Sequence, residues 1–315
     1  MRKIFVILMV FFLTTGVSLA ASPGTTGGSI LQVVEGAIPA GMGGAFTAIA
    51  SGDYAIDYNP AGLVSLDAPE AVAMYHSELA TISDDYFTFA TPINTTQAIA
   101  LHISYDYIPP INNGNGNPAV NAYDILFMGT YAFKLSNFIQ LGASLKYLRS
   151  VLAYYGTSAI AVDLGGQISH LPFGLKGGLA IQNLGGQLKY LSVGVPLPLI
   201  IRIGLGWETL VDQKRKLELD LDVVDDSSEG MGIRLGGEYW VFPRLFAIRA
   251  GINKISQNVY NSGFPPSLGF TLTDEVDSNK YSLDFAYNPA TLPGSIVDNT
   301  YLVSLRCSFE NWTIF

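Results

Sequence analysis

The strongest constraint on this chain is a two-residue alternation of apolar and polar side chains that recurs from about residue 70 onward. In residues 216–223 (KLELDLDV), leucine and valine alternate with a lysine and three carboxylates, and residues 280–287 and 301–309 follow the same rule. Because successive side chains of a strand point to opposite faces of a sheet, each segment has one apolar and one polar face. A water-soluble sandwich and a membrane barrel both use such strands, but they place the polar faces differently.

The number of alternating segments favours a barrel. About fourteen can be counted, and single-chain outer-membrane barrels have an even number of strands. The expected strands are residues 70–78, 84–92, 97–108, 121–133, 138–150, 157–168, 173–183, 198–208, 215–224, 231–240, 245–253, 264–273, 278–287 and 300–309.

The connections between these segments supply a second test, because short and long ones alternate. The expected tight turns are residues 134–137, 169–172, 241–244 and 274–277. The expected long loops are residues 109–120, 184–197, 254–263 and 288–299. Outer-membrane barrels have short periplasmic turns and longer outer loops, whereas a sandwich has no reason to sort its loops in this way. The pattern predicts an all-β transmembrane protein, an antiparallel outer-membrane barrel of about fourteen strands, with periplasmic N- and C-termini.

The beginning of the chain indicates export. Arg2 and Lys3 precede an unbroken apolar run over residues 4–13, and the small residues Ser18 and Ala20 occupy the −3 and −1 positions of a cleavage site before Ala21. This is the pattern of a secretory signal peptide, and the run falls well short of the roughly 20 residues that a membrane-spanning helix needs. We therefore expect residues 1–20 to be a signal peptide, residues 21–69 a separate N-terminal segment and residues 70–315 the barrel.

The composition agrees with a barrel in a membrane. Hydrophobic residues make up 49% of the chain and charged residues only 14%, whereas soluble domains carry about a quarter charged residues. No later apolar stretch is long enough for a membrane helix. The densest, residues 193–205, is interrupted by Pro196 and Pro198.

The N-terminal segment is rich in alanine and glycine and reads AGMGGAFTAIASGDYAIDYNPAGL over residues 40–63. Asp53 is expected to cap a short helix, and Asn59 with Pro60 to begin another turn, because asparagine accepts backbone N–H bonds and proline fits the first helical position. A soluble periplasmic tail would be more polar. The segment is therefore expected to form a small helical hatch inside the barrel.

The polar faces of the strands carry charges of both signs, which a barrel would direct into its lumen. Ion pairs that hold the barrel in shape and a charged, selective pore are the two interpretations, and we favour the first for any single residue. The residues expected in the lumen are Asp106, Lys146, Asp163, Lys176, Arg202, Glu218, Asp220, Asp222, Arg234, Glu238, Arg249, Asp284 and Arg306.

Several kinds of chemistry find no support in the sequence. The net charge of −9 argues against a nucleic-acid partner, which needs clustered lysine and arginine. His76, His102 and His170 have no metal-ligand spacing and stand beside no obvious nucleophile. The glycine pairs do not form a phosphate-binding loop. We expect no enzyme activity, no catalytic residues, no metal and no cofactor.

Several motifs together resemble one family of barrels. MGGAFTAIA at 42–50 and YNPAGL at 58–63 are similar to the N-terminal signature of FadL-like barrels, specifically of the PorV/PorQ group. The similarity continues through LKYL, AVDLGG, GLAIQNLGG, LGGEYW, IRAG and LVSLRCSF. The resemblance implies fourteen strands with an N-terminal hatch. Its matching hatch residues are Gly43, Gly44, Asn59, Pro60, Ala61 and Gly62.

The resemblance implies two functions of different kinds. PorV-like members act with the type IX secretion machinery as partners that receive cargo proteins, whereas FadL takes up long-chain fatty acids and other hydrophobic molecules. The charged lumen and the apolar loop at 184–197 favour a docking or accessory role in protein export, or a purely structural barrel. Passive transport of hydrophobic molecules is the alternative. The expected partners are outer-membrane lipid with either secretion-system proteins or a hydrophobic ligand.

Overall fold

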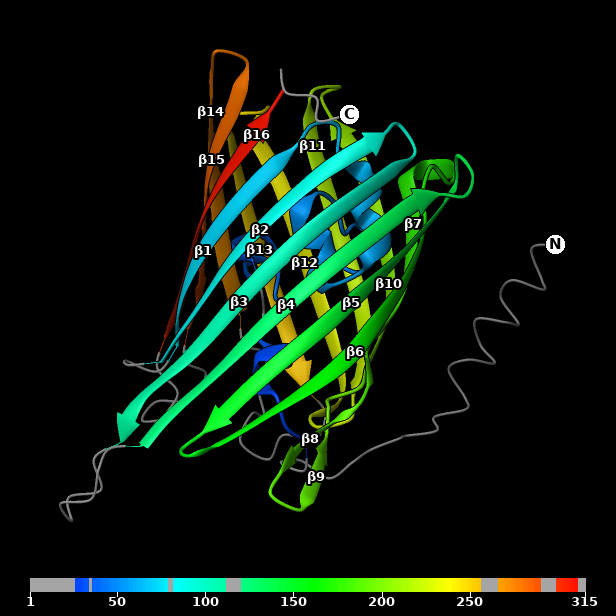
Figure 1. Cartoon of the computed structure of the whole chain (residues 1–315). Coiled ribbons are helices and arrows are strands. Elements are labelled where there is room, and N and C mark those ends of the chain that lie inside the picture. The colour runs from blue at the N-terminus through cyan, green and yellow to red at the C-terminus, as the bar shows by residue number, and fades with distance from the viewer. Residues whose placement is uncertain are drawn as a thin grey trace.

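The computed structural model describes residues 26–33, 36–78, 82–111, 120–255, 266–289 and 299–310. Within them, fourteen antiparallel strands close into one barrel, in which the first strand pairs with the last (Figure 1). The barrel strands are β1 (Glu70–Glu78), β2 (Ile82–Asn94), β3 (Gln97–Ile111), β4 (Val120–Lys134), β5 (Ile139–Leu152), β6 (Tyr155–Ile168), β7 (Leu175–Gly185), β10 (Ile200–Val211), β11 (Arg215–Asp226), β12 (Gly230–Phe242), β13 (Phe246–Ile255), β14 (Pro266–Val276), β15 (Asn279–Asn288) and β16 (Thr300–Phe309). The expected fold class is confirmed.

The barrel presents apolar side chains outward and polar ones inward. In β5 the side chains of Leu145 and Tyr147 are exposed on the outer surface, while Ser144 and Lys146 between them are buried. This is the reverse of a soluble protein and suits a barrel whose outer face contacts lipid. Among the residues that the structure describes, no helix is long and apolar enough to cross a bilayer.

The two ends of the barrel differ in their connections. All six connections at the end shown at the top of Figure 1 are tight, such as those between β2 and β3 and between β14 and β15. The opposite end carries the longer connections, including residues 186–199, although the β5–β6 and β11–β12 turns there are also short. The orientation expected from the sequence, with the short turns on the periplasmic side, stays a prediction.

The N-terminal residues run through the lumen. Residues 26–33, the leading segment, contain η1 (Ser29–Gln32) and lie at the long-loop end. Residues 36–69, the hatch, contain α2 (Ala37–Gly41), η2 (Asp53–Asp57) and η3 (Pro60–Ser65), and reach the short-turn end where β1 begins (Figure 1). Nearly every hatch residue is buried.

The first described residues of the N-terminal segment contact the long-loop end, where Gly27 N donates to Pro196 O at 2.9 Å. Two details differ from the sequence-based expectations. The loop at 184–197 contains a hairpin of β8 (Gln187–Tyr190) and β9 (Val193–Pro196). Asp53 does not cap η2, because its carboxylate is buried toward Arg306 instead. The expected signal peptide lies outside the described residues.

Candidate functional site

The inner wall of the barrel lacks side chains where the hatch presses against it. A Cβ atom at Gly178 would overlap Thr47 O, and one at Gly251 would overlap the backbone of Met42. The wall glycines whose missing Cβ position is occupied by hatch atoms are Gly142, Gly165, Gly178, Gly204, Gly206, Gly236 and Gly251. The hatch backbone therefore packs directly on the strands, without room for side chains or a continuous water layer between them.

Two wall carboxylates hold the turn at residues 45–48. Asp222 Oδ2 accepts hydrogen bonds from Phe46 N at 3.0 Å, Thr47 N at 3.1 Å and Thr47 Oγ1 at 2.7 Å. Two residues earlier on β11, Asp220 Oδ2 accepts from Ala48 N at 3.2 Å. These two residues were expected to face the lumen, and the structure gives them backbone N–H donors of the hatch as partners.

Wall amides complement these carboxylates by donating to hatch carbonyls. Gln167 Nε2 lies within 3.3 Å of the carbonyl oxygens of Thr47, Ala48 and Ala50. Gln182 Nε2 donates to Asp57 O at 2.7 Å. Since buried backbone groups must find partners, these contacts replace the hydrogen bonds that short helical turns cannot make for themselves.

The NPAG motif acts as a local cap and as a link to the wall. Asn59 Oδ1 accepts from Ala61 N at 3.2 Å, while its Nδ2 donates to Thr47 O at 3.0 Å and to Gly166 O at 3.1 Å. Pro60 occupies the first position of η3, as expected. A Cβ atom at Gly62 would overlap Ala50 O, so only glycine fits.

The paired glycines of the hatch are required by backbone conformation as well as space. Gly43 and Gly44 have φ angles of 66° and 75°, a region that favours glycine. A Cβ atom on Gly43 would lie 2.8 Å from Ile252 N, and one on Gly44 would lie 2.7 Å from Arg234 Nη1. Both residues therefore contact the wall directly.

A cluster around Arg306 links the hatch to β15 and β16. The guanidinium lies 3.9 Å from Asp53 Oδ1 and 3.7 Å from Asp284 Oδ2, and it stands over the Tyr54 ring at 5.6 Å. Tyr54 Oη donates to Asp284 Oδ2 at 2.9 Å. Burial, with a contribution from the Glu70 carboxylate, raises the pKa of Asp53 well above its usual value, and Arg306 opposes this shift.

A second cluster braces a bulge in the wall. Lys146 Nζ lies 2.7 Å from Asp163 Oδ2 and 2.9 Å from Asn183 Oδ1, and Asn183 N donates to Asp163 Oδ1 at 2.7 Å. Asn183 has a φ of 61°, and the register of β6 and β7 shifts here. Nearby, Arg202 Nε donates to Gln182 at 2.7 Å.

The remaining expected lumen charges also lie on the inner wall. Arg249 Nε contacts Glu238 Oε2 at 2.7 Å. At the short-turn end, Glu218 lies between Lys216 and Lys176, at 2.6 Å and 3.1 Å. Arg234 stands opposite Asp222 on the neighbouring strand, and Asp106 stands between Asp84 and Asp124. Except for Asp106, which stands among carboxylates, most of these charges pair with an opposite charge or contact the hatch, and their geometry is that of a scaffold rather than of an open charged pore.

The long-loop half of the lumen contains a packed apolar cluster, which is called the apolar chamber below. Its residues come from the leading segment, β4, β5, β6, the β8–β9 hairpin and the residue that follows this hairpin. They are Ile30, Leu126, Leu148, Ala159, Ala161, Leu188 and Leu197. The Ile30 side chain packs in this cluster and is 1% exposed.

Sequence reasoning did not identify the polar residues that join the hatch to the wall, and it did not identify the apolar chamber. Thr47, Gln167 and Gln182 resemble ordinary polar positions of alternating segments. The apolar residues of the chamber come from five separate stretches, so no local pattern joins them. Leu188 lies in a loop that was noted for its apolar residues, which was the one usable signal.

No family model matches the sequence, and no curated protein is similar to it. Solved structures, however, share its fold. The Ralstonia pickettii toluene transporter TbuX has a TM-score of 0.59 at 12% identity, over 87% of this chain and 98% of that one. The P. putida toluene transporter TodX has a TM-score of 0.60 at 11% identity, over 88% and 99%.

A Pseudomonas aeruginosa FadL homologue is also similar, with a TM-score of 0.53 at 11% identity over 86% of this chain and 97% of that one. At these identities the likeness shows the fold alone, which is that of FadL-like barrels. It gives no support to the narrower PorV/PorQ assignment, which rests on the sequence motifs.

Proposed function

We propose that this barrel is a passive route for small hydrophobic molecules across the outer membrane, in which the leading segment occupies the ligand chamber when no ligand is present. The apolar chamber around Ile30 is the observation that carries the proposal. It offers a hydrophobic molecule a desolvated site at the long-loop end of the lumen.

The leading segment is the part of the plug that can leave at low cost. Gly27 N donates to Pro196 O, and Gln32 Nε2 donates to Asp226 Oδ2 at 2.9 Å and to Ser228 Oγ. Otherwise it contacts the barrel through apolar side chains. An incoming hydrophobic molecule can replace these contacts, since the hydrophobic effect is not directional.

The wall beside the chamber is interrupted, which supplies an exit. The pairing of β7 with β10 ends at Gln182 and Ile200, and β7 pairs with β6 only as far as Gly185. Beyond that point the β8–β9 hairpin covers β6, through bonds such as that from Lys189 N to Thr157 Oγ1 at 2.8 Å. A molecule in the chamber is thus separated from the lipid by a hairpin rather than by a continuous strand ladder.

The proposal departs from the favoured sequence interpretation. Several of the lumen charges that argued against hydrophobic passage are already paired, as Lys146 is with Asp163, and the chamber residues themselves are apolar. Two of the proteins with a similar fold are described as toluene transporters, which supports the hydrophobic class of ligand. Docking of secretion partners remains the competing hypothesis.

A reversible lock on the leading segment tests the proposal. A Cβ atom at Gly27 would lie 3.6 Å from Val195 Cβ, within the usual range for a disulfide. The double variant Gly27→Cys/Val195→Cys, in a Cys307→Ser background, should therefore tie the segment to β9. In intact cells with a lipopolysaccharide outer leaflet, entry of the fluorescent probe N-phenyl-1-naphthylamine should fall to the level of cells without the protein, and return after reduction.

The matched control is the single variant Gly27→Cys in the same Cys307→Ser background, which carries the same new side chain but has no partner thiol on β9. Oxidation of this variant should leave probe entry unchanged. Equal probe entry with the leading segment locked and free would contradict the proposal, and stoichiometric recovery of a secretion subunit with the purified protein would then favour docking.

A further inference from the structure

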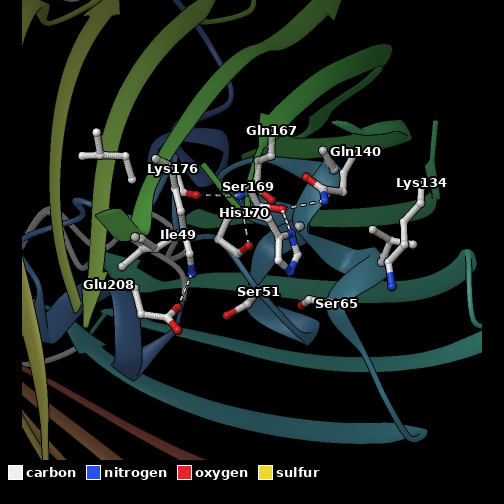
Figure 2. Close-up of a pocket in the computed structure, with 17 residues that line it drawn as sticks. Ile49, Ser51, Ser65, Lys134, Gln140, Gln167, Ser169, His170, Lys176 and Glu208 are labelled. Carbon is white, nitrogen blue, oxygen red and sulfur yellow. Dashed lines mark hydrogen bonds and ion pairs between the residues drawn. The ribbon is translucent and has the colours of Figure 1, made fainter. Parts of the chain in front are cut away.

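A cavity lies at the opposite, short-turn end, between the hatch and the ends of β4–β7 and β10. It has a volume of about 370 Å³ and opens at a rim of exposed side chains from Ser51, Ser65, Lys134 and His170 (Figure 2). Its apolar lining is Ile49, Ala50, Ala61, Val64 and Leu175. The size is at the lower end of the range for small-molecule sites, which is about 300–1,000 Å³.

Most polar groups that line this cavity already have partners. Gln167 Nε2 is used by three hatch carbonyls, and Lys134 Nζ donates to Thr95 O at 3.0 Å. Lys176 Nζ donates to Glu208 Oε2 at 2.6 Å and to Glu218 Oε1 at 3.1 Å (Figure 2 shows the Glu208 pair). These groups form a satisfied frame around the apolar lining.

Gln140 is the exception. Its Nε2 donates to Ser169 Oγ at 2.8 Å, and Ser169 Oγ lies 2.9 Å from His170 Nδ1. The Ser169 hydroxyl has one hydrogen. When it donates this hydrogen to His170 Nδ1, Ser169 Oγ can only accept from Gln140, so the Nε2 atom of the Gln140 amide points to Ser169 and the Oε1 atom points away. Gln140 Oε1 then accepts no hydrogen bond from any residue that the structure describes, although the residue is only 7% exposed.

A buried acceptor of this kind is costly unless a donor meets it. Lys176 and Glu208 pair with each other, so neither is left to neutralise a charged ligand, and the cavity favours a neutral donor. The apolar lining adds a requirement for a hydrophobic body.

We propose that this cavity binds small, neutral, hydrophobic molecules that carry one hydroxyl or N–H group, and that this group donates to Gln140 Oε1. The site is separate from the chamber at Ile30. It does not depend on passage through the barrel, since the cavity opens at its own end.

Two probes of nearly equal shape test the site. Binding of 4-fluorophenol and 4-fluorotoluene to the full chain in detergent micelles can be followed by fluorine NMR, with protein-free micelles as the background. In Gln140→Met the ratio of the two affinities should shift against 4-fluorophenol by up to about tenfold, the worth of one hydrogen bond to an otherwise unpaired acceptor. Gln97→Met, at the nearby β2–β3 turn, should leave the ratio unchanged.

A second variant keeps the proposal testable if Gln140→Met does not fold. In a Cys307→Ser background, Ser51→Cys labelled with N-ethylmaleimide should fill the rim and abolish 4-fluorophenol binding. An unchanged ratio in folded Gln140→Met, or undiminished binding to the labelled protein, would overturn the proposal. The Gly27→Cys/Val195→Cys lock should block probe entry but leave 4-fluorophenol binding intact, so the two proposals fail separately.

Discussion

The hatch and the leading segment both pack apolar side chains against the wall, but the hatch adds many more polar bonds to it. Carboxylates, amides and ion pairs join the hatch to the wall, with Asp222 and Gln167 each contacting three hatch atoms. The leading segment is held mainly by apolar contacts around Ile30. Both regions are buried, so burial alone does not distinguish a fixed plug from a displaceable one.

The difference lies in what displacement leaves behind. Withdrawal of residues 45–48 would strand Asp222 and several backbone groups, each at a cost of about 1–3 kcal/mol. Withdrawal of Ile30 would expose one apolar side chain, at a cost of about 1.5–3 kcal/mol that a hydrophobic ligand can offset by taking its place. We therefore expect the hatch to stay in place and the leading segment to exchange with a ligand.

The largest expected effect comes from filling the space that the hatch backbone uses. Gly178→Val would place side-chain atoms where Thr47 O lies, and should lower the stability of the seated hatch by about 3 kcal/mol or more. Gly177→Val is the matched control, since no atom lies within 4 Å of its Cβ position. Protease cleavage of the hatch in purified protein measures the effect. Equal cleavage of the two variants would show that the hatch does not depend on wall contact.

Two buried isoleucines compare the regions directly. Ile56 in the hatch is 0% exposed and Ile30 is 1% exposed. Ile56→Ala should destabilise the hatch by about 2–4 kcal/mol, because the cavity is surrounded by fixed structure. Ile30→Ala should leave hatch stability unchanged and accelerate probe entry. Hydrogen exchange, measured peptide by peptide, tests both variants. Faster exchange throughout the hatch in Ile30→Ala would contradict the idea that the hatch and the leading segment are held independently.

The carboxylate cap should contribute a smaller amount. Asp222→Asn keeps the shape of the side chain but removes the charge that strengthens three hydrogen bonds. The free energy of local opening at residues 45–50, measured by hydrogen exchange, should therefore fall by about 1.5–3 kcal/mol. Asp225→Asn lies on the same strand and should have no such effect. If residues 26–33 became exposed as readily as residues 45–50, the two regions would be one cooperative unit.

The sequence predicted the barrel well because its information is local. The alternation in residues 216–223 predicts an apolar and a polar face even when the partner strand is not known. Asn59 with Pro60 predicts the start of η3 in the same local way. The order of long and short connections then fixed the antiparallel arrangement. The β8–β9 hairpin was not predicted, because its two strands have only four residues each and lie beside glycine and proline.

The site could not be predicted to the same depth because its contacts join distant residues. Asp222 binds Phe46 across 176 positions, and alternation shows only that Asp222 faces inward, not what it meets. Asp53 has the position and type of a helix cap, but burial beside Arg306 outweighs capping. Prediction of the apolar chamber would likewise require knowing that residue 30 reaches the long-loop end of the barrel.

The smallest effect would sharpen the comparison most, because it concerns the few polar bonds of the leading segment. Gln32→Ala removes the donor to Asp226 and Ser228, and should make opening of residues 26–33 easier by about 1 kcal/mol. Hydrogen exchange there should accelerate by roughly fivefold, with probe entry increased and exchange at residues 45–50 unchanged. Ser29→Ala, at an exposed position of the same segment, is the control. If Gln32→Ala instead accelerated exchange in the hatch, Gln32 would couple the two halves, and ligand entry would loosen the whole plug rather than its outer part.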